Sequence, residues 1–437
     1  MQQAISGNMM IGLLLAYKLA MDVTYIQYIH EYLNWERLYD VNLDIDEYLL
    51  AWLVCACVLI IFKSTLQKPL NLYRFSECTL FVLVILVVLP GIAMCGAGAF
   101  SQEYTRLYYF YWIWFFLLAR LFMTLNIHDL PMVGRLSSIA KKRILFFLCI
   151  VFVGSVMTVF FYYGEGRFYF DSLQSHALYS FRLFFRKISM SVFLQYIIAN
   201  ASIFFLFLLM YCFKERWYLG ACFILLVQYM NFSCGADKVV ALTTLIGVGV
   251  YATKRFLTGP KMICFAIGIL IFAMVAWDVY SNVFLLNSFR RVFFEPSVIG
   301  CFYRSYFQSH ATIFDSLLGN GTIDRSIIPF EIGRLYYSDI ENHANNGFIG
   351  DAFMMFGECG VIFGPVLYCL YFCILDKVSE NIDWWIKLGM AVYWAMKMVN
   401  SSFSTNMLSH GGILMAVMAY LYVVKGRDRL LKLEMET

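Results

Sequence analysis

The chain has 437 residues and a formal net charge of +4 at pH 7, and 61% of its residues are apolar and 19% aromatic. Its mean hydropathy of +0.70 is far beyond what the core of one soluble domain needs, so the lipid bilayer is the solvent for most of the chain. The small charge and the absence of a long Lys/Arg block exclude a nucleic-acid-binding protein. The composition predicts an all-α polytopic integral membrane protein that has the bilayer as a partner.

The 13 cysteines lie mostly inside apolar runs, where cysteine behaves as a small hydrophobic residue. Only Cys301 lies well inside the long polar segment described below, and Cys234 stands near a predicted helix end. This distribution indicates neither a disulfide framework nor a CxxC metal site. We therefore expect no metal ion and no cofactor.

Twelve apolar runs approach the length of about 20 residues that a membrane-spanning helix requires. The first, around Met9 to Ile29, is longer than the apolar core of a cleavable signal and lacks a basic start, so we expect it to be retained. The seventh and eighth are joined by a tight turn that contains Gly235. The runs lie near residues 8–28, 47–64, 78–98, 107–125, 143–163, 188–213, 217–234, 237–253, 261–281, 347–375, 384–403 and 407–424.

Positive charge is distributed unevenly between the two sides of this topology. Most Lys and Arg residues of the short connections fall on the side that carries both chain ends. Because such residues mark the cytoplasmic side, we expect both termini in the cytoplasm. Residues 1–281 then hold helices 1–9, residues 282–346 form one large external loop, and residues 347–437 hold helices 10–12 and a cytoplasmic tail.

Few charged residues lie inside the predicted spans. Lys18 and Asp22 are four residues apart in the first span, a spacing at which two opposite charges neutralise each other on one helix face. No internal repeat stands out, and with only seven prolines broken helices are not expected.

Arg290 and Arg291 open the external loop, on the side of the membrane where positive charge is usually scarce. The planar guanidinium group grips phosphate oxygens with two hydrogen bonds, and a lipid-linked pyrophosphate would lie at this depth. The alternative is an interfacial anchor that reaches the lipid headgroups. Both interpretations stay open on the sequence.

His343 closes the loop just before a predicted helix that begins near Gly347. An exposed histidine can take a proton from a hydroxyl group as a general base, although a single histidine on a loop is more often part of a polar surface. Asn345 and Asn346 beside it supply amide donors and acceptors suited to sugar hydroxyls. Asparagine at a helix start also serves as a cap.

Asp351 and Glu358 lie seven residues apart in the next predicted helix and are expected on one face of it. Buried carboxylates within a span are costly and usually functional, whereas the glycines around Glu358 allow close helix contact or a kink, of which close packing is the default explanation. Lys238, after the turn between the seventh and eighth spans, offers an ammonium group beside free backbone N–H groups. That combination is a weak signal for an anion site.

These features together resemble the Wzy-type O-antigen polymerases, which are oligosaccharide repeat unit polymerases of GT-C-like architecture. The opening Arg290-Arg291-x-Phe293-Phe294-x-Pro296, followed by Tyr303-x-x-Tyr306-Phe307, is similar to the loop opening of many such proteins. The stretch from His343 to Asp351, continued by Gly357-x-x-Gly360, is similar to the end of their loop and also to the His-Asn helix start of O-antigen ligases. The turn Gly235-Ala236-Asp237-Lys238 is similar to a turn of small residues plus Lys in those polymerases.

The resemblance implies a metal-independent glycosyltransferase of lipopolysaccharide or other surface polysaccharide biosynthesis, at the periplasmic face of the bacterial inner membrane. The growing glycan would leave one undecaprenyl pyrophosphate and join the terminal sugar of a repeat unit on another, and the family usually works with a chain-length regulator protein. His343 or Asp351 would take the proton of the attacking hydroxyl. The implied substrate contacts are Arg290, Arg291, Lys238, Tyr303, Asn345 and Asn346.

Two other functions remain open at this stage. An O-antigen ligase shares the architecture but passes the glycan to a lipid A core, and here Asn345 stands one place further from His343 than in an adjacent His-Asn pair. A lipid-linked oligosaccharide flippase or other transporter often has twelve spans as well. A flippase is expected to lack a long external loop and to carry charges along a central cavity, whereas the spans here hold few charges.

Overall fold

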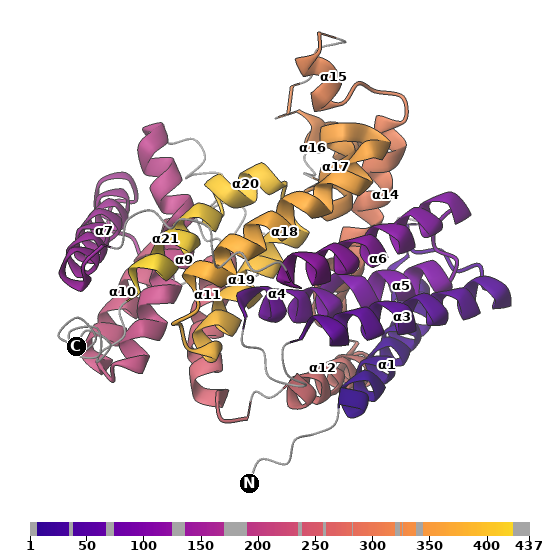
Figure 1. Cartoon of the computed structure of the whole chain (residues 1–437), viewed down its shortest axis with the longest axis horizontal. Coiled ribbons are helices and arrows are strands. Elements are labelled where there is room, and N and C mark those ends of the chain that lie inside the picture. The colour runs from indigo at the N-terminus through magenta and orange to yellow at the C-terminus, as the bar shows by residue number, and fades with distance from the viewer. Residues whose placement is uncertain are drawn as a thin grey trace. The chain divides into compact units, whose positions relative to one another are not determined.

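The computed structural model describes residues 7–34, 38–66, 74–124, 136–169, 190–234, 238–256, 259–281, 283–319, 324–325, 327–337 and 344–422. All regular elements among these residues are helices, with no strand (Figure 1). The all-α class predicted from the sequence is therefore confirmed.

Eight helices in the described part of the chain are long and apolar enough to cross a membrane. They correspond to the first six predicted spans and to the ninth and tenth, so the chain has the character of a polytopic membrane protein. The total of twelve spans and the orientation of the termini stay predictions. The eight helical stretches are Asn8–Leu33, Ile45–Thr65, Phe75–Gly96, Gln102–Thr124, Ser138–Tyr163, Val192–Lys214, Gly259–Tyr280 and Phe348–Val378.

The other four predicted spans are shorter or interrupted. The helices α10 (Tyr218–Ser233), α11 (Lys238–Thr253) and α19 (Trp384–Val399) have 16 residues each, which corresponds to about 24 Å of helix. The last predicted span is divided into α20 (Phe403–Leu408) and α21 (Gly412–Leu421). Gly411 between them has φ +82°, and a Cβ atom there would lie 2.3 Å from Ile203 Cγ2.

A second interruption lies in the tenth predicted span, where α17 (Phe348–Phe356) and α18 (Gly360–Val378) are separated by a 3-10 turn, η6 (Gly357–Cys359). Gly357 has φ +58°, a conformation that favours glycine. The turn brings the chain back on itself, because a Cβ atom on Gly360 would lie only 1.9 Å from the carbonyl oxygen of Ala352. The helix is thus interrupted at Gly357, among the glycines for which the sequence allowed a kink, whereas the interruption at Gly411 was not obvious from the sequence.

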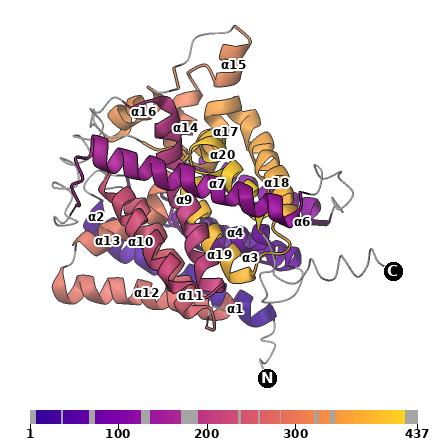
Figure 2. The ribbon, with the colours of Figure 1, turned by 90° about the vertical axis from the view of Figure 1, so that its left-hand side faces the viewer.

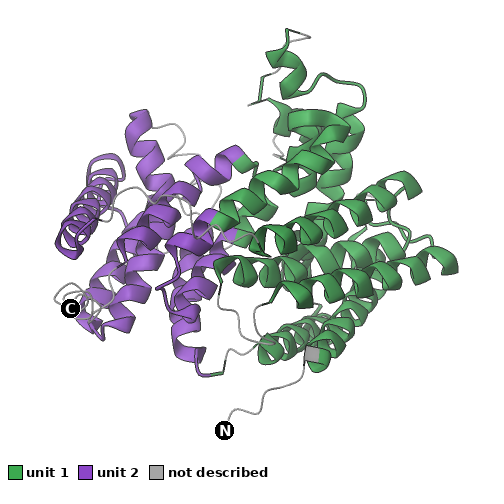
Figure 3. Cartoon of the chain, in the orientation of Figure 1, with its two compact units in different colours: residues 1–126, 256–373, 395–403 green, residues 127–255, 374–394, 404–437 purple. Residues whose placement is uncertain are grey.

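The chain forms two compact units, which are described separately here (Figure 3). Unit 1 comprises residues 1–126, 256–373 and 395–403, and unit 2 comprises residues 127–255, 374–394 and 404–437. Unit 1 is the unit that carries most of the predicted site residues.

The centre of unit 1 is the helical stretch Phe75–Gly96, whose most apolar window is 94% buried. It consists of α4 (Phe75–Leu83), the π-helical η2 (Val84–Val88) and α5 (Leu89–Gly96). Pro90 has no N–H to donate, and the shift to π-type bonding occurs immediately before it. Against this centre pack α1 (Gly7–Val23), α3 (Ile45–Thr65), α6 (Gln102–Thr124) and the π-helical η5 (Arg290–Phe294). The helix α12 (Gly259–Tyr280) packs on α1, which continues as η1 (Thr24–Ile29) and α2 (His30–Leu33).

The segment between α12 and α17 contains no membrane-length apolar helix among its described residues, but it is mostly helical. One continuous helical run is formed by α13 (Val283–Phe289), the π-helical η5 (Arg290–Phe294) and α14 (Glu295–Phe307). Two short helices follow, α15 (Ile313–Leu317) and α16 (Ile328–Tyr337). The predicted loop is thus a largely helical segment, and its location on the periplasmic side stays a prediction.

In unit 2, α9 (Val192–Lys214) is the common packing partner (Figure 2). It contacts α7 (Ser138–Thr158), which continues as the π-helical η4 (Val159–Tyr163), and also α10, α11 and α21. Asn200 on α9 donates to the carbonyl oxygen of Leu408 over 3.0 Å. This bond satisfies a carbonyl left free where α20 ends.

Candidate functional site

The candidate site lies where α14 packs along α17 in unit 1 (Figure 1). These helices carry Tyr303 and Asp351, and the described residues just before α17 are Ala344 to Gly347. The later part of the opening motif, which lies on α14, therefore contacts the closing motif, which includes α17. The contact is made by α14, whereas Arg290 and Arg291 belong to η5.

Arg290 is 5% exposed, and its Nε donates to Asn287 Oδ1 over 3.0 Å. Its guanidinium carbon also lies 5.2 Å from the centre of the Tyr39 ring, within the range of a cation–π contact. Arg291 is different, because its side chain is 61% exposed and pairs with Glu295 over 3.7 Å. Of the two predicted phosphate-binding arginines, only Arg291 presents its side chain to the surroundings.

The helical run keeps this arginine pair away from the α14–α17 contact. Thirteen residues separate Arg290 from Tyr303 within one continuous helix, a distance of about 20 Å at the usual rise per residue. The predicted catalytic and substrate-binding residues on these elements therefore fall into two groups. One group is the arginine pair, and the other comprises Tyr303, Asn345, Asn346 and Asp351.

Tyr303 is fully buried, and its hydroxyl donates to the carbonyl oxygen of Ala344 over 2.9 Å. Burial raises the pKa of its phenol well above the usual value, so the hydroxyl remains a donor. Its ring lies against Gly350, where a Cβ atom would come 3.1 Å from the ring. Tyr303 thus fixes the start of α17 and has no exposed surface to offer a sugar.

Asn345 and Asn346 point in different directions. Asn345 is exposed, whereas Asn346 is 8% exposed and its Nδ2 donates to Asp351 Oδ1 over 3.4 Å. Neither side chain caps α17, because the N-cap position is Gly347. A Cβ atom on Gly347 would lie 2.1 Å from the Val399 carbonyl oxygen, so a residue without a side chain is required there.

Asp351 is 5% exposed and uses both of its oxygens in hydrogen bonds. Oδ1 accepts from Asn346, and Oδ2 accepts from the backbone N–H of Phe403, the first residue of α20, over 2.7 Å. A carboxylate at a helix N-terminus is stabilised by the unpaired N–H groups there. These contacts hold Asn346 and the chain at Phe403 in place, while the predicted catalytic role of Asp351 stays a prediction.

Glu358 does not share a helix face with Asp351, contrary to the expectation from their spacing. The positive φ of Gly357 ends α17 before Glu358. The Glu358 side chain is 61% exposed and lies 3.6 Å from Arg304 Nε. Two residues seven apart lie on one face only when the helix between them is unbroken.

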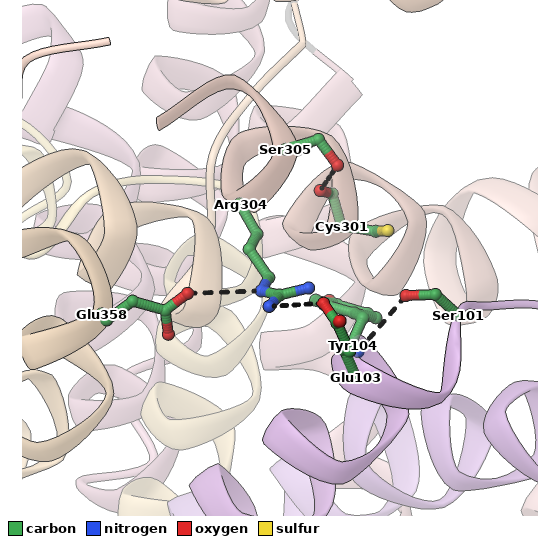
Figure 4. A network of polar contacts seen from close by, with 7 residues as sticks. All are labelled: Ser101, Glu103, Tyr104, Cys301, Arg304, Ser305 and Glu358. Atoms are coloured by element: carbon green, nitrogen blue, oxygen red, sulfur yellow. Dashed lines mark hydrogen bonds and ion pairs between the residues drawn. The ribbon is translucent and has the colours of Figure 1, made fainter. Parts of the chain in front are cut away.

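Arg304 forms the centre of a polar network that the sequence did not reveal (Figure 4). Its side chain is 13% exposed and lies between two carboxylates, with Nη2 3.4 Å from Glu103 Oε2 and Nε 3.6 Å from Glu358 Oε1. Glu103 belongs to the first turn of α6, and Arg304 follows Tyr303 directly on α14. The three charges are more than fifty residues apart in the sequence, so only the tertiary structure brings them together.

A second cluster outside the predicted set lies at the end of α14. The Tyr306 hydroxyl donates to Glu331 Oε2 over 2.5 Å, and its ring stacks on His310 with centres 3.9 Å apart. Burial and the neighbouring carboxylate raise the pKa of Tyr306 to about 12. His310 Nδ1 lies 2.8 Å from the Tyr306 carbonyl oxygen, which can only accept, so this nitrogen carries the proton.

Two predicted site residues are not placed with the rest. His343 lies outside the described residues, as do Glu341 and Asn342. Lys238 begins α11 in unit 2, and its side chain is outside the described part of the structure. The roles predicted for His343 and Lys238 therefore stay predictions.

Within the described ranges, no group of three or more His, Cys, Asp or Glu side chains could hold a metal ion. The chemistry available at the α14–α17 contact is that of a guanidinium group, carboxylates, phenols and amides. Such groups bind anions and hydroxyl-rich ligands. Comparisons with protein-family models, with curated proteins and with solved structures found no match to this chain.

Proposed function

We propose that this protein polymerises a surface polysaccharide such as O-antigen, by joining oligosaccharide repeat units carried on undecaprenyl pyrophosphate at the periplasmic face of the bacterial inner membrane. The reaction is a glycosyl transfer that needs no metal ion. The anomeric carbon of the growing glycan forms a bond to a hydroxyl oxygen of the next repeat unit. Its bond to the pyrophosphate of the carrier breaks, and the pyrophosphate leaves with the electron pair.

The observation that carries the proposal is a polar site on the helical run before α17 and at the start of α17, where the membrane-length stretch Phe348–Val378 begins. Arginine, tyrosine, asparagine and glutamate side chains gather on η5, α14 and the start of α17. An enzyme acting on lipid-linked sugars needs such a site beside the bilayer, because the lipid stays in the membrane while the sugar and phosphate groups stay in water. The sequence motifs similar to those of the Wzy-type polymerases lie on these same helices.

The proposed roles follow from the charge that develops during the transfer. The departing pyrophosphate gains negative charge, which a guanidinium group such as that of Arg291 stabilises most where charge appears. His343 takes the proton of the attacking hydroxyl as a general base. Asp351 positions Asn346 beside the start of α17, and the exposed Asn345 contacts sugar hydroxyls.

The proposal is tested by glycan banding in cells that lack this gene and are complemented at matched protein levels. The variants are Arg290→Ala, Arg291→Ala and His343→Ala. Arg167→Ala serves as control because its side chain is 75% exposed and pairs, among the described residues, with nearby Glu165. If the protein is a polymerase, knockout cells carry core plus a single repeat unit, and the wild-type gene restores the ladder of longer glycans. We expect Arg291→Ala and His343→Ala to reduce the ladder strongly and the control to restore it fully.

Other banding patterns would assign other functions. Bare core with polymer accumulating on the lipid carrier would make the protein a ligase. Bare core with single repeat units stranded on the cytoplasmic face would make it a flippase. A ladder that persists in the knockout would reject the proposed function altogether.

A further inference from the structure

We infer that Arg304 is the binding residue of a phosphate or diphosphate anion, and that Glu103 and Glu358 occupy its guanidinium group until the anion displaces them. The inference rests on the proposed function only in taking this anion to be the diphosphate of a lipid carrier. The anion site itself depends only on the position of Arg304 between Glu103 and Glu358 (Figure 4).

The guanidinium group of Arg304 makes few and long hydrogen bonds for a side chain that is only 13% exposed. Its Nε atom is buried and has no hydrogen-bond partner among the described residues, since the Glu358 oxygen is 3.6 Å away. Its contact with Glu103 is 3.4 Å long. Charge-assisted bonds between Arg and a carboxylate are normally 2.7–2.9 Å, and a guanidinium group has five N–H donors. The Nε–H group of Arg304 is therefore without an acceptor among the described residues, and the contact of Nη2 with Glu103 is long.

The two carboxylates are suited to being displaced. The side chains of Glu103 and Glu358 are 79% and 61% exposed, so each can turn into water without losing its hydration. Exposed ion pairs of this kind contribute little to stability. A phosphate group offers several oxygens to the fork of one arginine and can make two parallel bonds where each glutamate makes one long contact.

The position of Arg304 also favours an anion used in the proposed reaction. It follows Tyr303, whose hydroxyl holds the chain at the start of α17, and it pairs with Glu103 in the first turn of α6. Arg290 lies 14 residues earlier in the same helical run, about 21 Å away. Arg304 is therefore closer than Arg290 to Tyr303 and to the chain at the start of α17.

The experiment is a titration of the purified full-length protein in lipid nanodiscs with inorganic pyrophosphate, followed by microscale thermophoresis. We expect Arg304→Gln to weaken binding at least tenfold and Arg304→Lys, which keeps the charge without the fork, to give an intermediate affinity. The matched control is Arg167→Gln, which removes an exposed arginine that pairs with Glu165 over 2.7 Å and has no role in the proposed site, so it should leave the affinity unchanged. Circular dichroism and thermal unfolding check that each variant is folded.

Replacing Glu103 or Glu358 by glutamine tests whether these carboxylates compete with the anion for Arg304. If Glu103 and Glu358 compete with the anion, Glu103→Gln and Glu358→Gln each tighten pyrophosphate binding and the double variant tightens it most. A network that only ties three helices together would lose stability in these variants without gaining affinity. That second result, or an unchanged affinity in Arg304→Gln, would overturn the inference.

Two further arms separate the source of the phosphate and the role of the site. Nanodiscs of phosphatidylglycerol are compared with nanodiscs of phosphatidylcholine, and loss of pyrophosphate binding in the anionic lipid would assign the site to headgroups and overturn the carrier assignment. Banding in cells then separates site from function. If Arg304→Gln binds pyrophosphate weakly yet restores a full ladder, the role in polymerisation fails, and if the wild type makes no ladder, the proposed function fails whatever the titration shows.

Discussion

Replacing Asp22 by asparagine should destabilise unit 1 by about 3–5 kcal/mol, because the substitution leaves Lys18 as a buried charge without a counter-ion. Lys18 Nζ lies 2.6 Å from Asp22 Oδ2, and the two side chains are 0% and 3% exposed. The contact confirms that the two charges neutralise each other, as their spacing predicted. Because neither group reaches solvent, water cannot take the place of the missing partner.

The remaining contacts of Lys18 are already present in the wild type, so they do not replace the lost counter-ion. Its ammonium group lies 4.1 Å from the centre of the Trp52 ring and 4.7 Å from that of the Tyr48 ring. Cation–π contacts of this kind contribute about 0.5–2 kcal/mol each. The Tyr48 hydroxyl, which donates to Asp22 Oδ2 over 2.9 Å, can also donate to an amide oxygen, so that bond is largely preserved in the variant.

The assay is thermal unfolding of the purified protein in detergent, with wild type, Asp22→Asn, Lys18→Met and the double variant compared. We expect each single variant to lower the unfolding temperature clearly and the double variant to recover most of the loss, since it leaves no buried charge unpaired. The control is Arg106→Gln, which breaks a 3.2 Å pair with Glu47. The Arg106 side chain is 65% exposed, so its loss should cost less than about 1 kcal/mol.

Two results would refute this reasoning. If Asp22→Asn unfolded at the same temperature as the wild type, the Lys18 charge would not depend on its partner. If the double variant lost as much as the sum of the two single variants, the two side chains would act independently, and the ion pair would not be the source of the stability.

Three further variants test the packing at the candidate site by the same unfolding assay. Gly360→Ala should cost about 1–3 kcal/mol or more, because the new methyl group would lie 1.9 Å from the carbonyl oxygen of Ala352; wild-type stability would show that the turn opens easily. Tyr303→Phe should cost about 1 kcal/mol by removing the donor to Ala344, and an unchanged stability would show that water replaces it. Asp351→Ala should cost more, about 1–3 kcal/mol, because the part-buried N–H of Phe403 and the buried amide of Asn346 lose their acceptor. A smaller loss than in Tyr303→Phe would contradict this order.

The membrane-length helices were predictable from the sequence because their signal is local. About 20 consecutive apolar residues identify a span without knowledge of its neighbours, and eight of the predicted runs are helices of that kind. The interruptions at Gly357 and Gly411 were not predictable in the same way. Glycine is common within membrane helices, and only the positive φ values of these two residues show that they end a helix.

The candidate site was predictable only in part. The motifs predicted that Tyr303 and the residues before α17 belong together, and the bond to Ala344 joins them. The same motifs placed Arg290 in that group, although a continuous helix carries it about 20 Å away. The sequence did not single out Arg304, since its partners Glu103 and Glu358 come from distant segments. The available signal was a charged residue directly after Tyr303, on a helix that has to bury one face.

Helix α17 is held at its two ends by neighbouring residues of α14. Tyr303 bonds to Ala344 before its start, and Arg304 pairs with Glu358 just after its end. An anion that takes Arg304 from Glu358 releases the second contact and leaves the first. Coupling of this kind is reciprocal, so a weaker Arg304–Glu358 pair favours the anion, and the bound anion favours release of that end of α17. Glu103 is on α6 and makes no such contact with α17, so its loss should tighten anion binding without loosening the helix, whereas the loss of Glu358 should do both.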